Sequence, residues 1–528
     1  MSSGTLTTRN LRLAIGCVLA LASTAGSAQQ AASDQELEEI VVTGSQIRLP
    51  DPFAGGQVAE GGRAGILGNL TTLETPFSST NYTEELMRNQ QAKSVADVLL
   101  NDPNVRAARG FGNFQELFMI RGFPAYSDDM TYNGIYGILP RQFVASEYME
   151  RVELFRGASA FLNGAAPGGS NLGGTVNLVP KRAPAEGVRR LTVGWESDSA
   201  YYLAGDFGRR FGPDEQTGVR GNVAYRDGET SVEDQERELT VLAFGIDHDG
   251  ENFRLSADIG YQDHHIDAPR PSVTPLGGIP KPPDADSNFA QPWTYTDEEQ
   301  LFGVVRAEYD LTRAVSAWAA YGLRQGEEAN VLANPSALPD GSTSSYRFDN
   351  TREDDVSSGE IGLRWDFATG PIEHRIILSA SIFHIESNNA YAFSEFFPGF
   401  ASDLYDPVEV APPAATFFTG GNLNNPGKTF ETETSSLAIA DMMTFADGKF
   451  ILTLGARDQD LKSDNFDYNS GAKLSGYDES ELTPVGGIVF RPTDSVSIFA
   501  NYIEGLIAGD TAPFTGPAPG FLPVTNAG

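Results

Sequence analysis

Side chains that commonly hold metals or act as nucleophiles are sparse in this chain. The only cysteine is Cys17, and the five histidines are His248, His264, His265, His374 and His384. Neighbours in an extended strand point to opposite faces, so His264 and His265 are not expected to share a metal ion. We interpret them as solvated residues at the start of a loop. No serine–histidine–acid spacing or paired carboxylates stand out, so we expect no enzyme, no metal site and no resident cofactor.

Two other segments could carry chemistry. The glycine-rich run from Gly157 to Gly174 lacks the Gly-Lys-Ser/Thr ending of a phosphate-binding loop, so we interpret it as turns and close packing. The β-prone string Glu-Glu-Ile-Val-Val-Thr-Gly at 38–44 stands in a polar arm. It could add as a strand to a partner's sheet, or it could be an ordinary strand of the domain that follows.

Charge and the N-terminus limit the partners and the compartment. The formal net charge is -34, and nucleic-acid affinity comes mostly from Lys and Arg on phosphates, so we expect no nucleic-acid partner. Arg9 and Arg12 precede an apolar run from Leu13 to Ala22, and small residues follow through Ala28. This layout predicts a cleaved export signal over residues 1–28 and a mature protein outside the cytoplasm.

The chain changes character twice after this signal. Residues 29–75 are small, polar and glycine-rich, which is typical of an arm and linker. Residues 76–184 mix short helices and strands, and Ser94 with Asp97 predicts a capping box for a helix through Leu100. We therefore expect a compact α+β domain over 76–184.

From residue 188 onward, segments of about ten residues alternate between apolar and polar side chains. In one of them an apolar face opposes Arg254, Ser256 and Asp258; its residues are Phe253, Leu255, Ala257, Ile259 and Tyr261. About 13 such segments reach Glu504, and short connections alternate with long ones. The long ones are Asp263–Thr296, Gln325–Val356, Glu386–Phe430 and Lys462–Ser480. A soluble β-sandwich or β-helix would also alternate, but this segregation of connection lengths favours a transmembrane antiparallel β-barrel.

Several motifs have a more specific resemblance. They are Phe-Met-Ile-Arg-Gly-Phe at 118–123, ERVELFRGASAFLNGAAPGG at 150–169 and GGTVNLVPKR at 173–182. With them the chain resembles the TonB-dependent outer-membrane receptors, and more narrowly their ferric-siderophore branch. Stretches 61–69, 91–106 and 502–513 are similar to the same family. The resemblance implies an α+β plug domain, residues 76–184, inside a barrel whose N-terminal portion is residues 188–528.

The resemblance also implies roles for particular residues. Residues 38–44 resemble the TonB box, in which the residues that contact TonB in the periplasm would be Glu39, Ile40, Val41, Val42 and Thr43. Arg121 and Arg156 match plug arginines that pair with barrel glutamates and hold the plug, with Glu504 as one candidate partner. The alternative is that both arginines satisfy carbonyls within the plug.

Two plug turns, Ala107–Gln115 and Tyr136–Phe143, align with outward-facing loops of the family. They supply the candidate ligand-binding residues, which are Arg109, Phe111, Phe114, Tyr136, Arg141 and Phe143. Cations, aromatic rings and hydrogen-bond donors suit a bulky chelate with charged oxygens around its metal. Each residue could instead pack within the plug, and the chelator, not the protein, would bring the iron.

The expected function is therefore import of a ferric siderophore with energy transmitted by TonB. The setting would be the outer membrane of a Gram-negative bacterium, with a monomer in contact with lipid and lipopolysaccharide. Alternatives are a receptor for another scarce nutrient, such as a cobalamin or an oligosaccharide, and a passive or adhesive barrel. A plug of about 110 residues in the lumen argues against a porin.

The number of strands bears on the length of the chain. Complete barrels of the family have about 22 strands, whereas about 13 are expected here. About 13 strands would leave an open edge in lipid. We therefore expect this sequence to be the N-terminal portion of a longer receptor.

Overall fold

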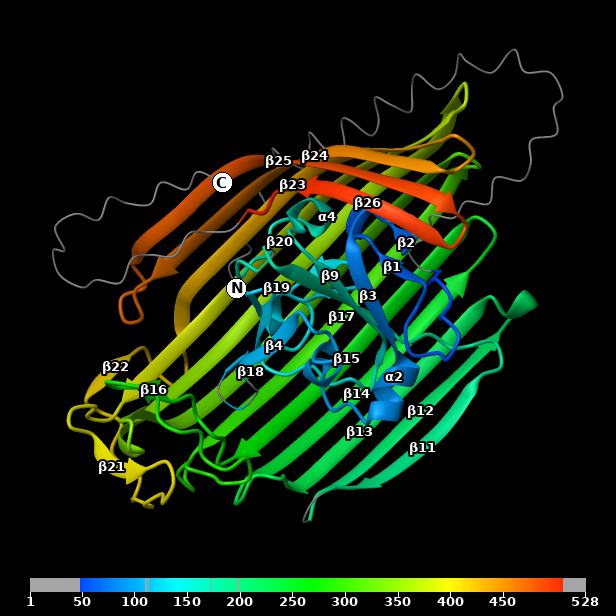
Figure 1. The fold of residues 1–528 in the computed structure, drawn as a ribbon. Coiled ribbons are helices and arrows are strands. Elements are labelled where there is room, and N and C mark those ends of the chain that lie inside the picture. Colours follow the sequence, from blue (N-terminus) through cyan, green and yellow to red (C-terminus); the bar gives the residue numbers. More distant parts are fainter. Residues whose placement is uncertain (1–47, 110–111, 113, 171, 197–198, 507–528) are drawn as a thin grey trace. The chain divides into compact units, whose positions relative to one another are not determined.

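A large antiparallel sheet dominates the computed structural model. Its main path contains thirteen strands in chain order, as predicted. These strands are β11 (Val188–Trp195), β12 (Tyr201–Phe211), β13 (Thr217–Glu229), β14 (Glu236–Asp249), β15 (Phe253–Asp267), β17 (Tyr295–Thr312), β18 (Val315–Ala337), β19 (Ser342–Thr369), β20 (Ile372–Phe393), β23 (Gly427–Phe445), β24 (Phe450–Phe466), β25 (Lys473–Thr493) and β26 (Val496–Ile503). Figure 1 shows them as one continuous curved sheet, which is named here the wall. Three short strands, β16 (Thr274–Pro275), β21 (Phe400–Asp403) and β22 (Phe418–Gly420), pair with β18, β19 and β20.

The structure describes residues 48–109, 112, 114–170, 172–196 and 199–506. These lie in one of two compact units of the chain, Gly44–Gly528. The predicted signal segment 1–28, the predicted TonB box with Glu39, Ile40, Val41, Val42 and Thr43, and the candidate ligand residue Phe111 lie outside the described residues. Their assigned roles stay predictions.

The two faces of the large sheet differ in chemistry. On one face apolar side chains are exposed, such as Ile259 at 55%, Val305 at 50% and Leu323 at 52%. On the other face polar side chains are buried, including Arg306 at 0% and Arg324 at 2% exposure. This inverts the pattern of a soluble protein and is that of a transmembrane barrel, with an apolar face toward lipid and a polar face toward the lumen.

Several strands are longer than the sequence pattern predicted. The expected connection Gln325–Val356 is mostly strand, because β18 and β19 leave only residues 338–341 between them. His264 and His265 lie inside β15, so their interpretation as loop residues was wrong. Outside the part of the sheet that carries exposed apolar side chains, both faces of a strand are polar. The apolar–polar alternation in the sequence therefore disappears there, although the hydrogen bonds between strands continue. The long connections that remain are 268–294 and 394–426.

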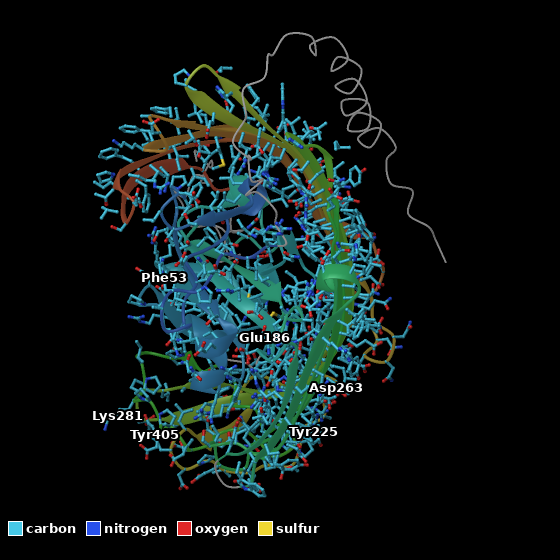
Figure 2. The ribbon with its side chains drawn as sticks, turned by 90° about the vertical axis from the view of Figure 1, so that its right-hand side faces the viewer. Phe53, Glu186, Tyr225, Asp263, Lys281 and Tyr405 are labelled. Atoms are coloured by element: carbon cyan, nitrogen blue, oxygen red, sulfur yellow. The ribbon has the colours of Figure 1, made fainter. Side chains whose placement is uncertain are left out.

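The two long connections lie at the same end of the sheet, as expected, whereas the expected long connections Gln325–Val356 and Lys462–Ser480 are mostly strand. One end, named here the long-loop end, carries the connections 196–200, 230–235, 268–294, 338–341, 394–426 and 467–472. The opposite end has connections such as 313–314 and 370–371. Tight turns of this kind join adjacent antiparallel strands directly. Figure 2 shows Lys281 and Tyr405 side by side at the long-loop end, where the Tyr405 hydroxyl donates to the Lys281 carbonyl at 2.9 Å.

The plug region, residues 48–184, lies against the polar face of the sheet. Its five-stranded sheet has the order β3 (Ser78–Thr83), β9 (Met149–Arg156), β10 (Gly174–Pro180), β7 (Thr131–Tyr132) and β8 (Ile135–Tyr136). A second sheet contains β4 (Val105–Arg109), β5 (Leu117–Ile120) and β6 (Phe123–Tyr126), and β1 (Gly61–Arg63) pairs with β2 (Asn69–Thr71). The helices are α2 (Glu84–Gln90), α3 (Val95–Leu99) and α4 (Ala160–Asn163), with single turns η2 (Gly65–Leu67) and η3 (Ser127–Asp129).

Local sequence explains where these elements begin. The predicted capping box of Ser94 and Asp97 is present at the start of α3, where the Asp97 carboxylate accepts from the Ser94 N–H at 3.3 Å. The folded part of the plug region begins before residue 76, because β1 and β2 precede it and Leu67 is completely buried. Among the described residues, no helix is long and apolar enough to cross a membrane.

Candidate functional site

The plug region contacts the wall through a buried ion pair at Arg141. Its Nε and Nη2 donate to the two carboxylate oxygens of Glu328 on β18, at 2.6 and 2.5 Å. The neighbouring Gln142 adds a side-chain hydrogen bond to Glu328 at 2.6 Å and a backbone N–H to Glu298 on β17 at 2.7 Å. Both Arg141 and Glu328 are at most 5% exposed. This group, Arg141, Gln142, Glu298 and Glu328, is named here the upper clamp.

Residues that directly follow Gln142 in the chain are also held by the wall. Phe143 is completely buried, with its ring 4.7 Å from that of His264 and the Arg237 guanidinium 4.4 Å over it. Gln262 of β15 accepts from the Ala145 N–H at 3.2 Å and donates to the Phe143 carbonyl at 2.7 Å. Together with the upper clamp, these contacts hold the segment that follows β8 along four adjacent strands of the wall, β14, β15, β17 and β18.

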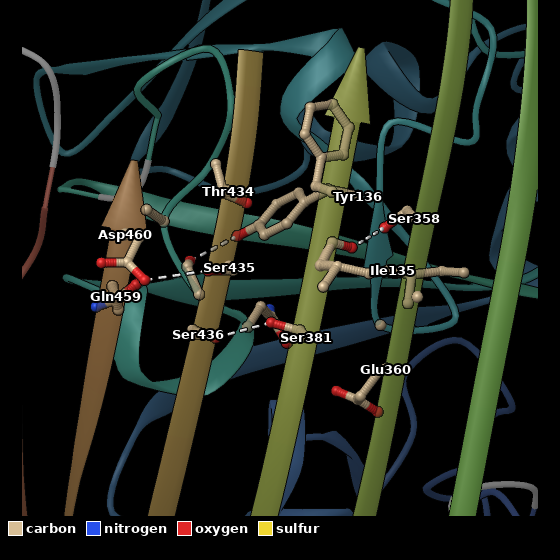
Figure 3. A pocket seen from close by; sticks show the side chains of 17 residues that line it. Ile135, Tyr136, Ser358, Glu360, Ser381, Thr434, Ser435, Ser436, Gln459 and Asp460 are labelled. Atoms are coloured by element: carbon tan, nitrogen blue, oxygen red, sulfur yellow. Dashed lines mark hydrogen bonds between the residues drawn. The ribbon is translucent and has the colours of Figure 1, made fainter. Parts of the chain in front are cut away.

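Tyr136 lies at a cavity of mixed polar and apolar lining between the plug region and the wall (Figure 3). Its hydroxyl donates to the Gly164 carbonyl at 3.4 Å. Serine side chains from three neighbouring strands line the cavity opposite it; they are Ser358, Ser381, Ser435 and Ser436. These hydroxyl groups can form hydrogen bonds with water, while Ile135, Ile382 and Phe383 supply apolar lining.

A second charged contact lies nearer the short-turn end of the sheet. Glu360 of β19 accepts from the Nη2 of plug residue Arg63 at 3.3 Å, from Arg306 at 3.1 Å and from the Trp318 indole at 2.7 Å. Burial, and then the charge of Arg306, lower the pKa of Arg63 to about 9, while Glu360 opposes the shift. One wall carboxylate thus binds two arginines, one from the plug region and one from the wall.

Further polar contacts hold other sides of the plug region. Arg182 pairs with Asp258 of β15 at 2.5 and 2.7 Å. Arg457 of β24 donates to the carbonyls of Phe161 and Leu162 in α4, at 2.8 and 3.3 Å. The plug region is therefore anchored by charged groups on β15, β17, β18, β19 and β24.

Arg156 is one of the two arginines expected to hold the plug against the barrel, and it contacts other residues of the plug region. Arg156 forms an ion pair with Asp102, a hydrogen bond to Ser78 at 3.2 Å and one to Thr80, all within the plug region. Burial acts to raise the pKa of Asp102, but hydrogen bonds from Arg156 and Asn104 hold it below its usual value. Within the described ranges the partners of Arg156 are thus plug residues, but they are a carboxylate and two hydroxyl groups rather than the carbonyls of the alternative interpretation.

Arg121 occupies the tight turn between β5 and β6, with a φ of 52° and an exposed side chain. No ion pair joins it to a carboxylate in the described part of the chain. Glu504, the candidate partner, accepts a hydrogen bond from Tyr502 instead. A role for Arg121 and Arg156 in holding the plug against the barrel stays a prediction, whereas Arg63, Arg141 and Arg182 make such contacts here.

The five candidate ligand residues that the structure describes are divided between two places. Arg109 and Phe114 lie toward the long-loop end, where the Gly112 carbonyl accepts from Thr296 of β17 at 3.1 Å. The Arg109 Nε donates to the Gln115 carbonyl at 3.0 Å, and burial lowers the pKa of Arg109. Tyr136, Arg141 and Phe143, by contrast, are buried against the wall. These three side chains contact the wall. The structure does not bring them together with Arg109 and Phe114.

A cluster of aromatic rings that the sequence did not reveal lies beside Phe114. The Phe114 ring is 6.0 Å from that of Phe348, which is 4.6 Å from Phe393. Other rings extend it into the connection 394–426, with Phe396 and Phe417 5.3 Å apart. The aromatic cluster consists of Phe114, Tyr346, Phe348, Tyr391, Phe393, Phe396, Phe417 and Phe418. Such rings present flat apolar surface to a bulky ligand.

One group of side chains has metal-ligand chemistry. His384, Glu431 and Glu433 place possible ligand atoms within 4.8 Å of one another on β20 and β23. Lys428 is 2.8 Å from Glu431 and Lys462 is 3.3 Å from Glu433. The two lysines compensate the carboxylates, so the group is an ordinary cross-strand ion-pair network.

Comparison with known families agrees with this architecture. Residues 71–170 match the TonB-dependent Receptor Plug Domain, and residues 185–527 match the TonB dependent receptor-like beta-barrel. The chain therefore belongs to the TonB-dependent receptors, and the family expected from its motifs is confirmed.

Individual relatives share this architecture. The chain is 37% identical over 480 residues to the ferrichrome receptor FcuA of Yersinia enterocolitica, covering 90% of this chain and 62% of FcuA. It is 25% identical to a ferric-pyoverdine BN7/BN8 receptor of Pseudomonas putida, covering 83% of this chain and 55% of that protein. The chain thus spans about three fifths of the curated relatives it matches.

Solved structures give the same result. The ferric preacinetobactin receptor BauA of Acinetobacter baumannii matches with a TM-score of 0.81 and 34% identity, over 89% of this chain and 70% of BauA. The pyoverdine receptor FpvA of Pseudomonas aeruginosa, bound to pyoverdine, matches with a TM-score of 0.73 and 20% identity, over 89% of this chain and 68% of FpvA. At this identity FpvA supports the fold alone.

Proposed function

We propose that the protein is a TonB-dependent receptor that binds a ferric siderophore outside the cell and imports it with energy transmitted by TonB. The observation that carries this proposal is a folded plug region held in the lumen by ion pairs, beside an aromatic cluster at the long-loop end. Relatives named as receptors for ferrichrome and ferric preacinetobactin support it.

In this mechanism the ligand arrives at the long-loop end and meets Arg109, Phe114 and the aromatic cluster. TonB then engages residues 38–44, and the applied force rearranges the plug region to open a path. The protein binds and moves its cargo without changing it, so the iron enters as part of the substrate, and no resident cofactor is required. The setting is the outer membrane, after removal of residues 1–28, with a monomer among lipid and lipopolysaccharide.

Hydrogen bonds connect the loop around Arg109 to the backbone of the upper clamp. The Glu116 N–H donates to the Gln142 carbonyl at 3.1 Å, and the Ser127 hydroxyl donates to the Arg141 carbonyl at 2.6 Å. Gln115, which precedes Glu116, accepts from Arg109. A ligand that displaces the loop around Arg109 therefore acts on the backbone that carries the upper clamp.

Deletion of residues 38–44 from the full chain tests the proposal. Uptake of radioactive iron from ferric siderophores under iron limitation should be lost, while binding of the same chelates at the cell surface should persist. A matched deletion of residues 29–35 in the same arm should leave uptake intact. Uptake that continues without residues 38–44, or in cells that lack TonB, would contradict the mechanism.

A further inference from the structure

We propose that the cargo is an uncharged ferric chelate, of the tris-hydroxamate class, and that the acidic long-loop end selects against anionic tris-catecholate chelates. This inference rests on the proposed function and adds the charge of the ligand to it. It is supported by the charge of the connections, the pairing of nearby cations and the exposed aromatic surface.

The connections at the long-loop end are strongly acidic. The six connections together contain twelve acidic residues and only two basic ones, Arg270 and Lys281. The longest, residues 394–426, contains Glu395, Asp403, Asp406 and Glu409 and no lysine or arginine. A trianionic chelate that approaches this end therefore meets a field of its own sign, whereas an uncharged chelate does not.

Two arginines on β19 near this end, Arg347 and Arg352, are already paired with carboxylates. Arg347 forms a double hydrogen bond with Asp349 at 2.7 and 2.8 Å and donates to the Pro413 carbonyl at 3.3 Å. Arg352 pairs with Asp354 at 2.8 Å. A guanidinium that is matched by a carboxylate leaves little net charge for a ligand.

Two plug arginines at this end bind backbone carbonyls. Arg106 donates to the carbonyls of Pro103 and Val105, at 3.0 and 2.7 Å, and Arg109 donates to that of Gln115 at 3.0 Å. Their two positive charges do not reverse the excess of ten acidic residues in the connections. In the part of the chain that the structure describes, the connections at the long-loop end thus keep an excess of negative charge.

The aromatic cluster provides the surface that an uncharged chelate needs. Phe396, Phe417 and Phe418 are 48%, 58% and 53% exposed, so their faces remain available. The connection that carries them is fixed to the connection 268–294, because Trp293 donates to the Val410 carbonyl at 3.0 Å and Gln291 donates to that of Val408 at 2.9 Å. A fixed apolar surface binds a bulky neutral ligand with little ordering cost.

The test measures the binding of two chelates of different charge to the full chain in isolated outer membranes. Ferrichrome is the uncharged tris-hydroxamate probe, and ferric enterobactin is the trianionic tris-catecholate probe. At about 20 mM salt we expect ferrichrome to bind at least about tenfold more tightly. At about 300 mM salt the Debye length is shorter, so the difference should shrink several-fold through tighter binding of the trianion.

A triple variant tests the source of the selection. Glu395→Gln, Asp406→Asn and Glu409→Gln together remove three exposed charges from the connection that carries part of the aromatic cluster. The variant should bind ferric enterobactin several-fold more tightly and ferrichrome unchanged. The matched control, Asp214→Asn, Glu215→Gln and Glu251→Gln, removes three exposed charges at the opposite end and should change neither affinity.

The outcomes separate the two proposals. If neither chelate binds, the proposed siderophore function itself fails. If ferric enterobactin binds as tightly as ferrichrome or more tightly, or if added salt weakens its binding, the protein is a siderophore receptor but the inference about charge is overturned. A triple variant that behaves like its matched control also overturns it.

Discussion

Replacement of Glu328 by glutamine tests the upper clamp directly. The change keeps the size of the side chain but removes the charge that faces Arg141. Three hydrogen bonds reach the Glu328 carboxylate, two from Arg141 and one from Gln142. The remaining carboxylate beside Arg141 is Asp128, at 3.8 Å. Loss of one partner of a buried ion pair costs about 3–5 kcal/mol, and glutamine retains one acceptor, so we take the lower end, about 3 kcal/mol.

This free energy predicts a specific change in hydrogen exchange. A difference of about 1.4 kcal/mol changes an equilibrium tenfold, so local opening of residues 138–145 should become about 100-fold more frequent in Glu328→Gln. The amides concerned include those of Gln142 and Ala145, which donate to Glu298 and Gln262. Exchange in β9 should stay as in the parent, since opening is local.

Glu327 supplies the control on the same strand. Its side chain is exposed on the opposite face of β18, so Glu327→Gln makes the same chemical change without touching the plug region. Equal protection of residues 138–145 in the two variants would refute the role given to the upper clamp. Replacing both partners, Arg141→Met with Glu328→Met, should restore part of the protection, because the apolar pair removes both charges of the ion pair, whereas Asp128 loses its neighbouring arginine.

Three further substitutions test neighbouring parts of the plug region. Arg156→Gln should speed exchange around Asp102 and β3 but leave residues 138–145 unchanged; faster exchange at the contact with the wall would instead favour the locking role. Burial first, and then Asp128, raise the pKa of Asp129 from 3.8 to about 6. The folded plug thus holds this proton more tightly than the unfolded chain, so stability at the Gly168 and Ser170 amides, corrected for intrinsic exchange rates, should fall as pH rises from about 4 to about 6; Asp129→Asn should abolish this trend. Gly137→Ala places a Cβ 2.4 Å from the Phe383 ring at a φ of 73°. It should cost about 1–3 kcal/mol, measured by exchange of residues 138–145, and adding Phe383→Leu should recover part of the loss.

The wall was predictable from the sequence because lipid imposes a pattern that local reading detects. In β15 the alternation from Phe253 to Tyr261 identified both the strand and its two faces. The same reading failed at the upper part of β18, where Gln325 and Glu327 face outward and the lumen side is also polar. There the strand is held by pairing with β17 and β19, which a local pattern does not contain.

The site was less predictable, since its partners are distant in sequence. Arg141 was singled out, but its partner Glu328 is 187 residues away, and Arg63 is 297 residues from Glu360. Residue types alone could not distinguish a ligand contact from a contact with the wall. The signal that could have helped is the two-residue period of a strand. Arg306 and Glu360 alternate with outward-facing apolar residues, and Glu328 lies an even number of residues from the lumen-facing Arg324.

The mixture of contacts at the wall has a consequence for transport. Apolar contacts such as Phe302 with Tyr132 and Tyr148, 5.9 and 5.8 Å between ring centroids, lose their stabilisation when water enters. Ion pairs add little net stability, because both partners regain hydration when they separate, yet they fix one orientation. A plug held by Arg141 and Glu328 is therefore well oriented but separates at modest cost once the lumen is wet.

Replacing Arg141 and Glu328 by apolar side chains should make it more costly to separate the plug from the wall. In Arg141→Met with Glu328→Met, water cannot compensate the separated side chains, so the upper clamp resists opening under force. If the proposed transport function is correct, this double variant should bind ferric chelate at the surface like the parent but import it several-fold more slowly. Glu327→Gln serves again as the control. Import at the parental rate with restored protection of residues 138–145 would show that opening of the upper clamp does not limit transport, and that the charge of this contact serves orientation alone.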